Sequence, residues 1–95
     1  MADLPAGRQA HWPTSSMFFV YVLKSLSRKY LYVGLTNNPK RRLKQHWDGK
    51  EKTTAPYRPF ERILLEQFSD RIDARKREKY LKSGVGKEYI KENFS

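Results

Sequence analysis

Residues 18–35 read FFVYVLKSLSRKYLYVGL, which is two apolar runs separated by a polar stretch. The runs over 18–23 and 30–35 are rich in the β-branched and aromatic side chains that strands favour, and residues 24–29 have the composition of a turn. This segment therefore predicts a β-hairpin whose second strand closes at Gly34.

The residues after the hairpin predict a helix over 39–47. Asn38 is suited to the N-cap, and the proline that follows it is suited to the first helical position. Leu43 and Trp47 recur four residues apart, as side chains on one side of a helix do. The polar stretch 48–59 that follows predicts a loop.

The second half of the chain predicts one more strand and two helices. Residues 63–68 form an apolar run between charged flanks, which favours a strand. Ser69 or Asp70 can cap a helix that ends before Gly84, which is expected at its C-terminal capping position. Residues 86–94 predict a short terminal helix. The order β-β-α-β-α-α predicts an α+β fold with a small, mainly antiparallel three-stranded sheet flanked by helices.

The composition indicates one small basic domain. The chain has 95 residues, with 20 Lys plus Arg against 10 Asp plus Glu, a formal net charge of +10 and an isoelectric point near 10.0. Such a charge favours a polyanionic partner, nucleic acid above all, although a solvated basic surface has the same composition. There is no cysteine, which excludes disulfides and thiolate metal sites.

Residues 1–16 are expected to be a disordered tail before a domain over 17–95, because they contain Pro, Gly, Ser and Thr without an apolar period. Met17 is a candidate natural start, and peptides from residues 1–16 in native protein would contradict that hypothesis. No apolar run approaches the roughly 20 residues of a membrane helix, and no signal-peptide pattern precedes the hairpin. We therefore expect a cytoplasmic protein without a membrane partner.

Two phenols are candidates for a functional site. Tyr21 and Tyr32 lie on the two strands of the predicted hairpin, so their side chains are expected to lie close together. Strand tyrosines that merely cover the edge of a core would give the same pattern.

The predicted first helix adds two further candidates. Arg42 and His46 are four residues apart on what we expect to be its exposed side, with Leu43 and Trp47 on the side facing the core. A guanidinium matches phosphate oxygens, and an imidazole can donate to a phosphate or relay a proton. A solvated basic helix face carrying a surface histidine is the alternative.

Glu78 is an isolated acid within a basic run on the predicted second helix. Mg²⁺ commonly takes one or two protein carboxylates, together with waters and substrate phosphates, so a single glutamate can suffice. The alternative is an intrahelical ion pair with Arg75 or Lys82.

Taken together, these residues resemble the motifs of the GIY-YIG nuclease family, over about residues 18–83. The likeness is closest to the short stand-alone bacterial members related to the nuclease domain of the bacterial excinuclease. The matching residues are Val-Tyr-Val at 20–22, Tyr-Val-Gly at 32–34, Arg42, His46 and Glu78.

The resemblance implies a role for each matching residue. Tyr21 and Tyr32 would line the site, and one of them would help to deprotonate the attacking water. Arg42 would hold the scissile phosphate, Glu78 would bind Mg²⁺ or Mn²⁺, and His46 would lie near the substrate.

The sequence also departs from the family pattern. The first motif lacks its glycine and isoleucine, and Leu35 stands where some relatives have lysine. Asn93 is a weak candidate for the late asparagine of many relatives.

The implied function is a metal-dependent endonuclease of the bacterial cytoplasm that hydrolyses DNA, with DNA favoured over RNA. Selectivity for DNA structure is expected because no separate module is present to read a sequence, and so is a link to repair or recombination. A non-catalytic nucleic-acid binder and a basic protein-interaction module are the alternatives, and a protein partner could direct the cut. The basic side chains expected to contact nucleic acid are Lys40, Arg41, Lys44, Lys50, Lys52, Arg58, Arg75 and Lys82.

Overall fold

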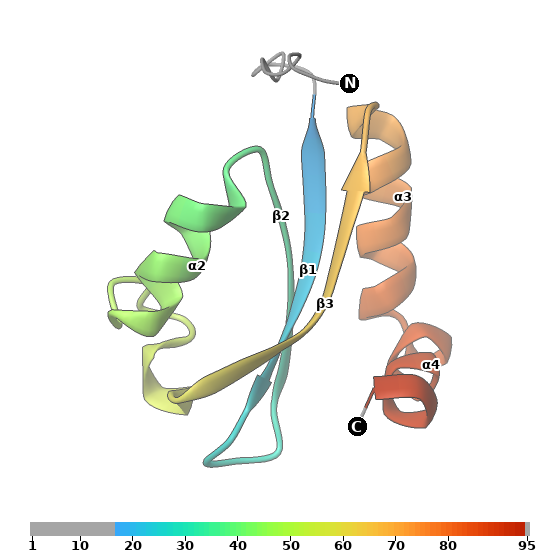
Figure 1. The fold of residues 1–95 in the computed structure, drawn as a ribbon. Coiled ribbons are helices and arrows are strands. Elements are labelled where there is room, and N and C mark those ends of the chain that lie inside the picture. The colour runs from blue at the N-terminus through green and yellow to red at the C-terminus, as the bar shows by residue number, and fades with distance from the viewer. Residues whose placement is uncertain (1–16, 95) are drawn as a thin grey trace, which may run out of the picture.

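The computed structural model describes residues 17–94, so the expectation of a disordered tail lies outside the described residues. Three strands and three α-helices follow one another in the predicted order β-β-α-β-α-α, with one short 3₁₀ turn (Figure 1). The elements are β1 (Phe18–Ser25), β2 (Leu31–Thr36), α2 (Pro39–Trp47), the 3₁₀ turn (Ala55–Tyr57), β3 (Phe60–Phe68), α3 (Arg71–Lys82) and α4 (Gly84–Phe94).

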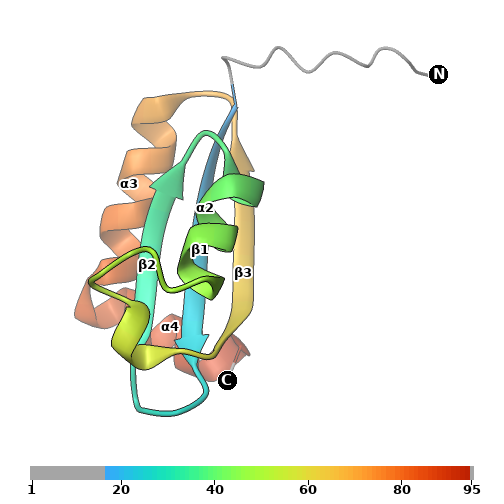
Figure 2. The same cartoon turned by 90° about the vertical axis from the view of Figure 1, so that its left-hand side faces the viewer.

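The sheet is antiparallel, with β1 in the middle and β2 and β3 at its edges. The helix α2 lies on one face, while α3 and α4 cover the other (Figures 1 and 2). The α+β fold predicted from the sequence is therefore confirmed.

Each face of the sheet has its own apolar cluster because side chains alternate along β1. Val20 and Val22 point toward α3 and α4, where they pack with Leu81 and Ile90. The α2 face has a second cluster whose members are Tyr21, Leu23 and Phe60, with Tyr32 and Leu43 packed against them. The aromatic residues of the hairpin therefore meet the helix that follows it.

The predicted start of α2 is confirmed. The side chain of Asn38 accepts a hydrogen bond from the backbone N–H of Arg41 at 3.1 Å, and Pro39 occupies the first helical position. The helix ends at Trp47, and Gly49 adopts a positive φ of 76° shortly afterwards, as residues that follow helix ends often do.

The third strand begins at Phe60, three residues earlier than predicted, because β1 continues to Ser25 and keeps pairing with it. Val22 pairs with Leu64 and Leu23 with Arg62, so Ile63 between them forms a bulge. The charged residues before Ile63 concealed this extension in the sequence.

The expected capping role of Gly84 is wrong. Asp70 caps α3 as predicted, accepting from the backbone N–H of Ile72 at 2.8 Å. At the other end, Ser83 is extended, and its hydroxyl oxygen accepts from the N–H of Gly86 at 3.1 Å. Ser83 therefore ends α3 and caps α4, so Gly84 begins α4 with no positive φ.

Candidate active site

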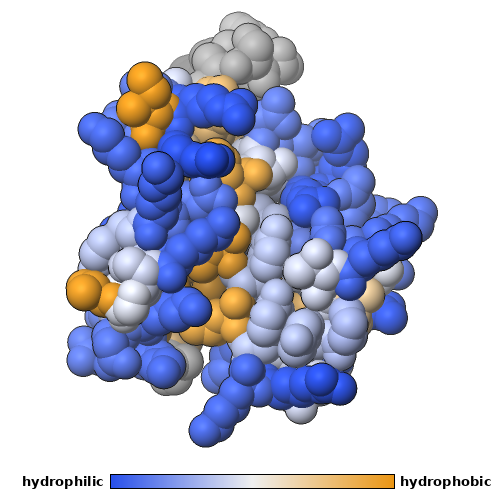
Figure 3. Space-filling model, turned by 180° about the vertical axis from the view of Figure 1, so that it is seen from behind, coloured by the Kyte–Doolittle hydropathy of each residue, from blue (hydrophilic) through white to orange (hydrophobic). Residues whose placement is uncertain are grey.

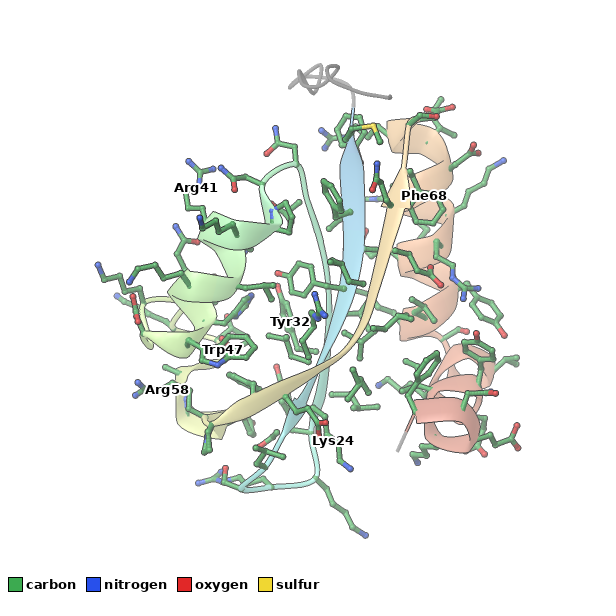
Figure 4. All side chains as sticks on the ribbon, viewed as in Figure 1. Lys24, Tyr32, Arg41, Trp47, Arg58 and Phe68 are labelled. Carbon is green, nitrogen blue, oxygen red and sulfur yellow. The ribbon has the colours of Figure 1, made fainter. Side chains whose placement is uncertain are left out.

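The two candidate tyrosines lie on the α2 face of the sheet, and their ring centroids are 6.0 Å apart. Tyr21 is fully buried, whereas Tyr32 is half-buried at the centre of the space between α2 and the strands (Figure 4). Gly34 is paired opposite Tyr21, and a Cβ at Gly34 would overlap Cζ and Oη of the Tyr21 ring. The absence of a side chain at Gly34 is what allows the phenol of Tyr21 to take this position.

We expect Gly34→Ala to displace Tyr21 and to lower the free energy of unfolding by about 1–3 kcal/mol, the usual cost of overpacking a core. Gly84→Ala is the matched control, because nothing lies within 4 Å of its added Cβ. Urea unfolding of the two variants tests the steric role of Gly34. Equal stability of the two variants would contradict it.

A hydrogen-bond chain links Tyr21 to the segment after α2. The Tyr21 hydroxyl lies 2.9 Å from Nε2 of His46, and Nδ1 of His46 lies 2.8 Å from Oγ1 of Thr54. The Thr54 hydroxyl is directed to the carbonyl oxygen of Glu51 at 3.4 Å, so its oxygen accepts from Nδ1–H. The network therefore assigns Nε2 as the proton acceptor for Tyr21.

The expectation that His46 faces solvent is wrong, and so is the placement of Trp47 in the core. His46 is 0% exposed, while Trp47 is 44% exposed. Burial of the imidazole is possible because Tyr21 and Thr54 satisfy both ring nitrogens. Helix α2 therefore turns His46 and Leu43 toward the sheet.

The pKa of His46 is lowered from 6.5 to about 4, mainly by burial and then by the positive charge of Arg42, while Glu51 opposes the shift. The unfolded chain takes up a proton on this histidine near its ordinary pKa of 6.5, whereas the folded protein does so only near pH 4. The contribution of neutral His46 to the free energy of unfolding is therefore fully present above pH 6.5, and it is lost as the pH falls toward 4.

We expect the free energy of unfolding to drop by about 3 kcal/mol between pH 7 and pH 4 through His46 alone. His46→Gln retains polar atoms without this titration and should flatten the pH dependence above pH 4.5. Urea midpoints at several pH values measure the difference. Parallel pH profiles of the two proteins would exclude His46 as the cause.

Arg42 lies beside both phenols. Its Nη1 donates to Oε1 of Gln45 and its Nη2 to Oε2 of Glu51, each at 3.0 Å. Its side chain also interacts with the hydroxyls of Tyr21 and Tyr32. Burial, and then the neighbouring Tyr32, raise the pKa of Tyr21, while Arg42 lowers it, so Tyr21 is a neutral phenol in the resting protein.

Arg42 and Glu78 line one open cavity of about 420 Å³ around the end of β2. They approach it from opposite faces of the sheet, Arg42 from α2 and Glu78 from α3. The remaining lining residues are Phe18, Leu35, Thr36, Asn37, Arg71 and Arg75. Three arginines and Asn37 make up half of the lining, which is a chemistry suited to a phosphate group.

The Glu78 side chain is 11% exposed and lies 3.5 Å from Nη1 of Arg75 and 3.2 Å from Nζ of Lys82. The intrahelical ion pairs considered from the sequence are thus present. The cations of both pairs are more than half exposed, and intrahelical pairs of this kind contribute only tenths of a kcal/mol.

A divalent ion fits this site only with help from a substrate. The described residues contain no group of three or more His, Cys, Asp or Glu side chains that could hold a metal alone. Glu78 supplies one nearly buried carboxylate in the cavity. One carboxylate, waters and phosphate oxygens together satisfy Mg²⁺, so the donor set agrees with a metal that binds with nucleic acid.

The other predicted residues fall into groups on the surface. Lys40, Arg41 and Lys44 are exposed on α2, and Arg41 points away from the sheet, as Arg58 does (Figure 4). Lys50, Lys52 and Arg58 lie in the segment before β3, and Arg75 and Lys82 lie on α3. Asn93 is exposed near the end of α4, where its Nδ2 donates to the carbonyl of Tyr89 at 2.9 Å, and it is not among the residues that line the cavity.

Several residues that the sequence did not single out take part in the site. Thr54 holds His46, Gln45 and Glu51 hold Arg42, and Asn37 and Arg71 line the cavity. Asn37 lies in the turn directly after β2, a position at which a functional role could have been suspected. Thr54 and Glu51 carried no signal, because their partners come from tertiary packing.

The chain is similar to several known proteins. Residues 17–93 match the GIY-YIG catalytic domain family. The chain is 40% identical over 83 residues to UPF0213 protein YazA of Bacillus subtilis (strain 168), covering 83% of this chain and 82% of that protein. It is 37% identical over 67 residues to UPF0213 protein CPE1444 of Clostridium perfringens (strain 13 / Type A), covering 70% and 71%.

Two further similarities concern function and fold. The chain is 42% identical over 69 residues to the structure-specific endonuclease subunit slx1 of Aspergillus terreus, covering 65% of this chain but 18% of that protein. The solution NMR structure of the UPF0213 protein BH0048 from Bacillus halodurans aligns with a TM-score of 0.51 and 29% identity, covering 80% of this chain and 83% of that chain.

Proposed function

Because the chain belongs to the GIY-YIG catalytic domain family, whose members have a nuclease-type domain, we propose that it is a metal-dependent endonuclease. Its proposed substrate is DNA, which it hydrolyses. The observation that carries the proposal is the cavity shared by Arg42 and Glu78, with the Tyr21–His46 pair behind Arg42. A phosphate clamp, a metal-binding carboxylate and a proton acceptor are thereby available at one place.

Arg42 is the group that holds the scissile phosphate. Its two Nη atoms donate to Gln45 and Glu51 in the resting protein, and two phosphate oxygens would replace these acceptors when substrate binds. As Arg42 turns to the phosphate, it uncovers the phenol of Tyr21. The phosphate charge also offsets the influence of Arg42 on His46, which raises the proton affinity of His46 when substrate is bound.

The proton of the attacking water passes to the oxygen of Tyr21 while the Tyr21 hydroxyl proton passes to Nε2 of His46. The water oxygen bonds to phosphorus, and the bond from phosphorus to the leaving oxygen breaks. Thr54 keeps the imidazole in the tautomer that this transfer requires.

Glu78 would hold Mg²⁺ or Mn²⁺ together with phosphate oxygens. The bound ion would supply a Lewis acid for the charge that develops on the phosphate and the leaving oxygen. This chain contributes the carboxylate and a wall of cations that keeps the substrate's phosphates in the cavity.

Structure-selective cleavage is the finer proposal, with a role in DNA repair or recombination. The similarity to a subunit named as a structure-specific endonuclease supports it. A protein partner that directs the cut agrees with the same relative, which is a subunit. No helix among the described residues has the length and apolarity to cross a membrane. We propose the bacterial cytoplasm as the location of this protein, because the relatives of similar length are bacterial proteins.

The proposal is tested by incubating the protein with linear, flapped and branched DNA and RNA, with Mg²⁺ or Mn²⁺ and with EDTA. We expect metal-dependent cleavage of at least one branched or flapped DNA. Absence of cleavage on every substrate with either metal, while binding persists, would refute the nuclease proposal.

A non-catalytic nucleic-acid binder on the same scaffold is the second candidate. It is favoured by the closed state of the site, in which Tyr21 is 0% exposed and Glu78 is paired with two cations. Steeply salt-dependent binding without cleavage is the result that this alternative requires.

A further inference from the structure

A second cationic cavity lies at the opposite end of the sheet from the candidate active site. It has a volume of about 510 Å³ and is lined by the hairpin turn between β1 and β2 and by α4. These two elements lie at one end of the molecule, whereas the start of α3 and the β2–α2 turn lie at the other (Figures 1 and 2). Its basic lining residues are Lys24, Arg28, Lys29, Lys87 and Lys91.

Basic side chains predominate in the lining of this cavity, where they are five of the seven lining residues. Within residues 17–94, Lys24, Arg28, Lys29 and Lys87 form no ion pair, whereas Lys44, Arg75, Arg77 and Lys82 do. No acid of the described chain lines the cavity. Mutually repelling cations held together without acids indicate a site for an anion that is supplied from outside.

The hairpin side of the cavity is held firmly in place. The hydroxyl of Ser25 donates to the carbonyl of Tyr57 at 2.6 Å, and that of Ser27 donates to the carbonyl of Arg58 at 3.0 Å. The ring of Tyr30, which lines the cavity, stacks on Tyr57 with centroids 3.7 Å apart. The cations are therefore carried by a preorganised turn, which lowers the entropic cost of binding a ligand.

Both cavities adjoin β2, the exposed edge strand. The active-site cavity uses Leu35 and Thr36 at the end of β2, and the second cavity uses Leu31 at its start. At about 3.3 Å per residue, Leu31 and Leu35 are roughly 13 Å apart. Viewed from this side, hydrophilic residues flank a narrow apolar band (Figure 3).

We propose that the strand held for cleavage continues along the β2 edge and that its phosphates bind the second cavity. A nucleic-acid strand rises about 3.4 Å per nucleotide, so the span corresponds to roughly four nucleotides beyond the active site. The lysines and Arg28 contact the phosphates, while Tyr30 and Leu31 form an apolar floor for sugars and bases. This inference rests on the proposed function, because it assumes nucleic acid in the active-site cavity.

The test is binding of labelled single-stranded DNA of about two and about ten nucleotides, measured by fluorescence anisotropy in EDTA at several salt concentrations. Only the longer strand can reach both cavities. Lys29→Glu and, separately, Lys87→Glu should weaken binding of the longer strand and lower its salt slope by about one each, with little change for the shorter strand.

Arg62→Glu is the matched control, because Arg62 is exposed and unpaired within the described residues and lies on β3, at the other edge of the sheet. The same charge change at Arg62 should leave the length dependence intact. Equal effects of Lys29→Glu and Arg62→Glu would overturn the proposal, and so would equal losses on both strand lengths. This experiment measures binding and not cleavage. A protein that cleaves no DNA would therefore refute the nuclease proposal, but the binding comparison would still test the second cavity.

Discussion

Glu78→Ala is expected to lower the rate of DNA cleavage by at least about a hundredfold while leaving DNA binding in EDTA nearly unchanged. The carboxylate is the one acidic group among the lining residues of the active-site cavity, so its removal takes away the proposed protein ligand of the metal. Binding should persist or strengthen slightly, because the variant exchanges a negative charge for none beside Arg75 and Lys82.

The control for Glu78 is Glu66→Ala. Glu66 also pairs with an arginine of α3, through bonds of 2.8 and 3.0 Å to Arg77, but it lies on β3 away from the cavity. Both variants therefore lose an ion pair with a cation of α3, but only Glu78→Ala loses a carboxylate from the cavity. Full cleavage by Glu78→Ala, or an equal defect in Glu66→Ala, would show that Glu78 has only a structural role.

Local signals in the sequence were sufficient for most of the fold. The two apolar runs in residues 18–35 and the Asn38-Pro39 start of α2 depend on neighbours in the chain, and both predictions are confirmed. The role of Gly84 was mistaken because Ser83 satisfies the backbone of α4 through its hydroxyl, which the glycine itself does not reveal. Element order was thus more predictable than the junction of two helices.

The orientation of α2 illustrates why the site was harder to predict. Helical spacing grouped Arg42 with His46, but hydrophobicity suggested that Trp47 rather than His46 would be buried. Burial of His46 depends on Thr54 and on a phenol 25 residues earlier in the chain. A polar residue that acquires both partners through tertiary packing cannot be placed from its own helix.

The second large effect that we expect concerns the buried hydrogen bond between Tyr21 and His46. Tyr21→Phe should lower the rate of the chemical step by about 10²–10⁴-fold, the contribution of a positioned proton-transfer group. The ring of Tyr21 fills the space over Gly34 and is kept by phenylalanine, so the fold should survive. The variant leaves Nε2 of His46 without its donor, which should cost about 1–3 kcal/mol of stability.

Single-turnover cleavage with saturating protein measures this step apart from binding. Tyr80→Phe is the control, because it removes a phenol hydroxyl from the outer side of α3. Tyr32→Phe compares the second phenol, which is half-buried and also contacts Arg42. A loss at Tyr32 that exceeds the loss at Tyr21 would assign the proton transfer to Tyr32 instead.

A double variant then separates a relay from two independent groups. If the proton passes from Tyr21 to His46, either Tyr21→Phe or His46→Gln already breaks the path, and combining them should add little further loss. Fully additive losses would mean that His46 acts on the rate without receiving the proton of Tyr21. The 2.9 Å bond between Tyr21 Oη and Nε2 of His46, together with the Thr54 contact at Nδ1, is the reason to expect non-additivity.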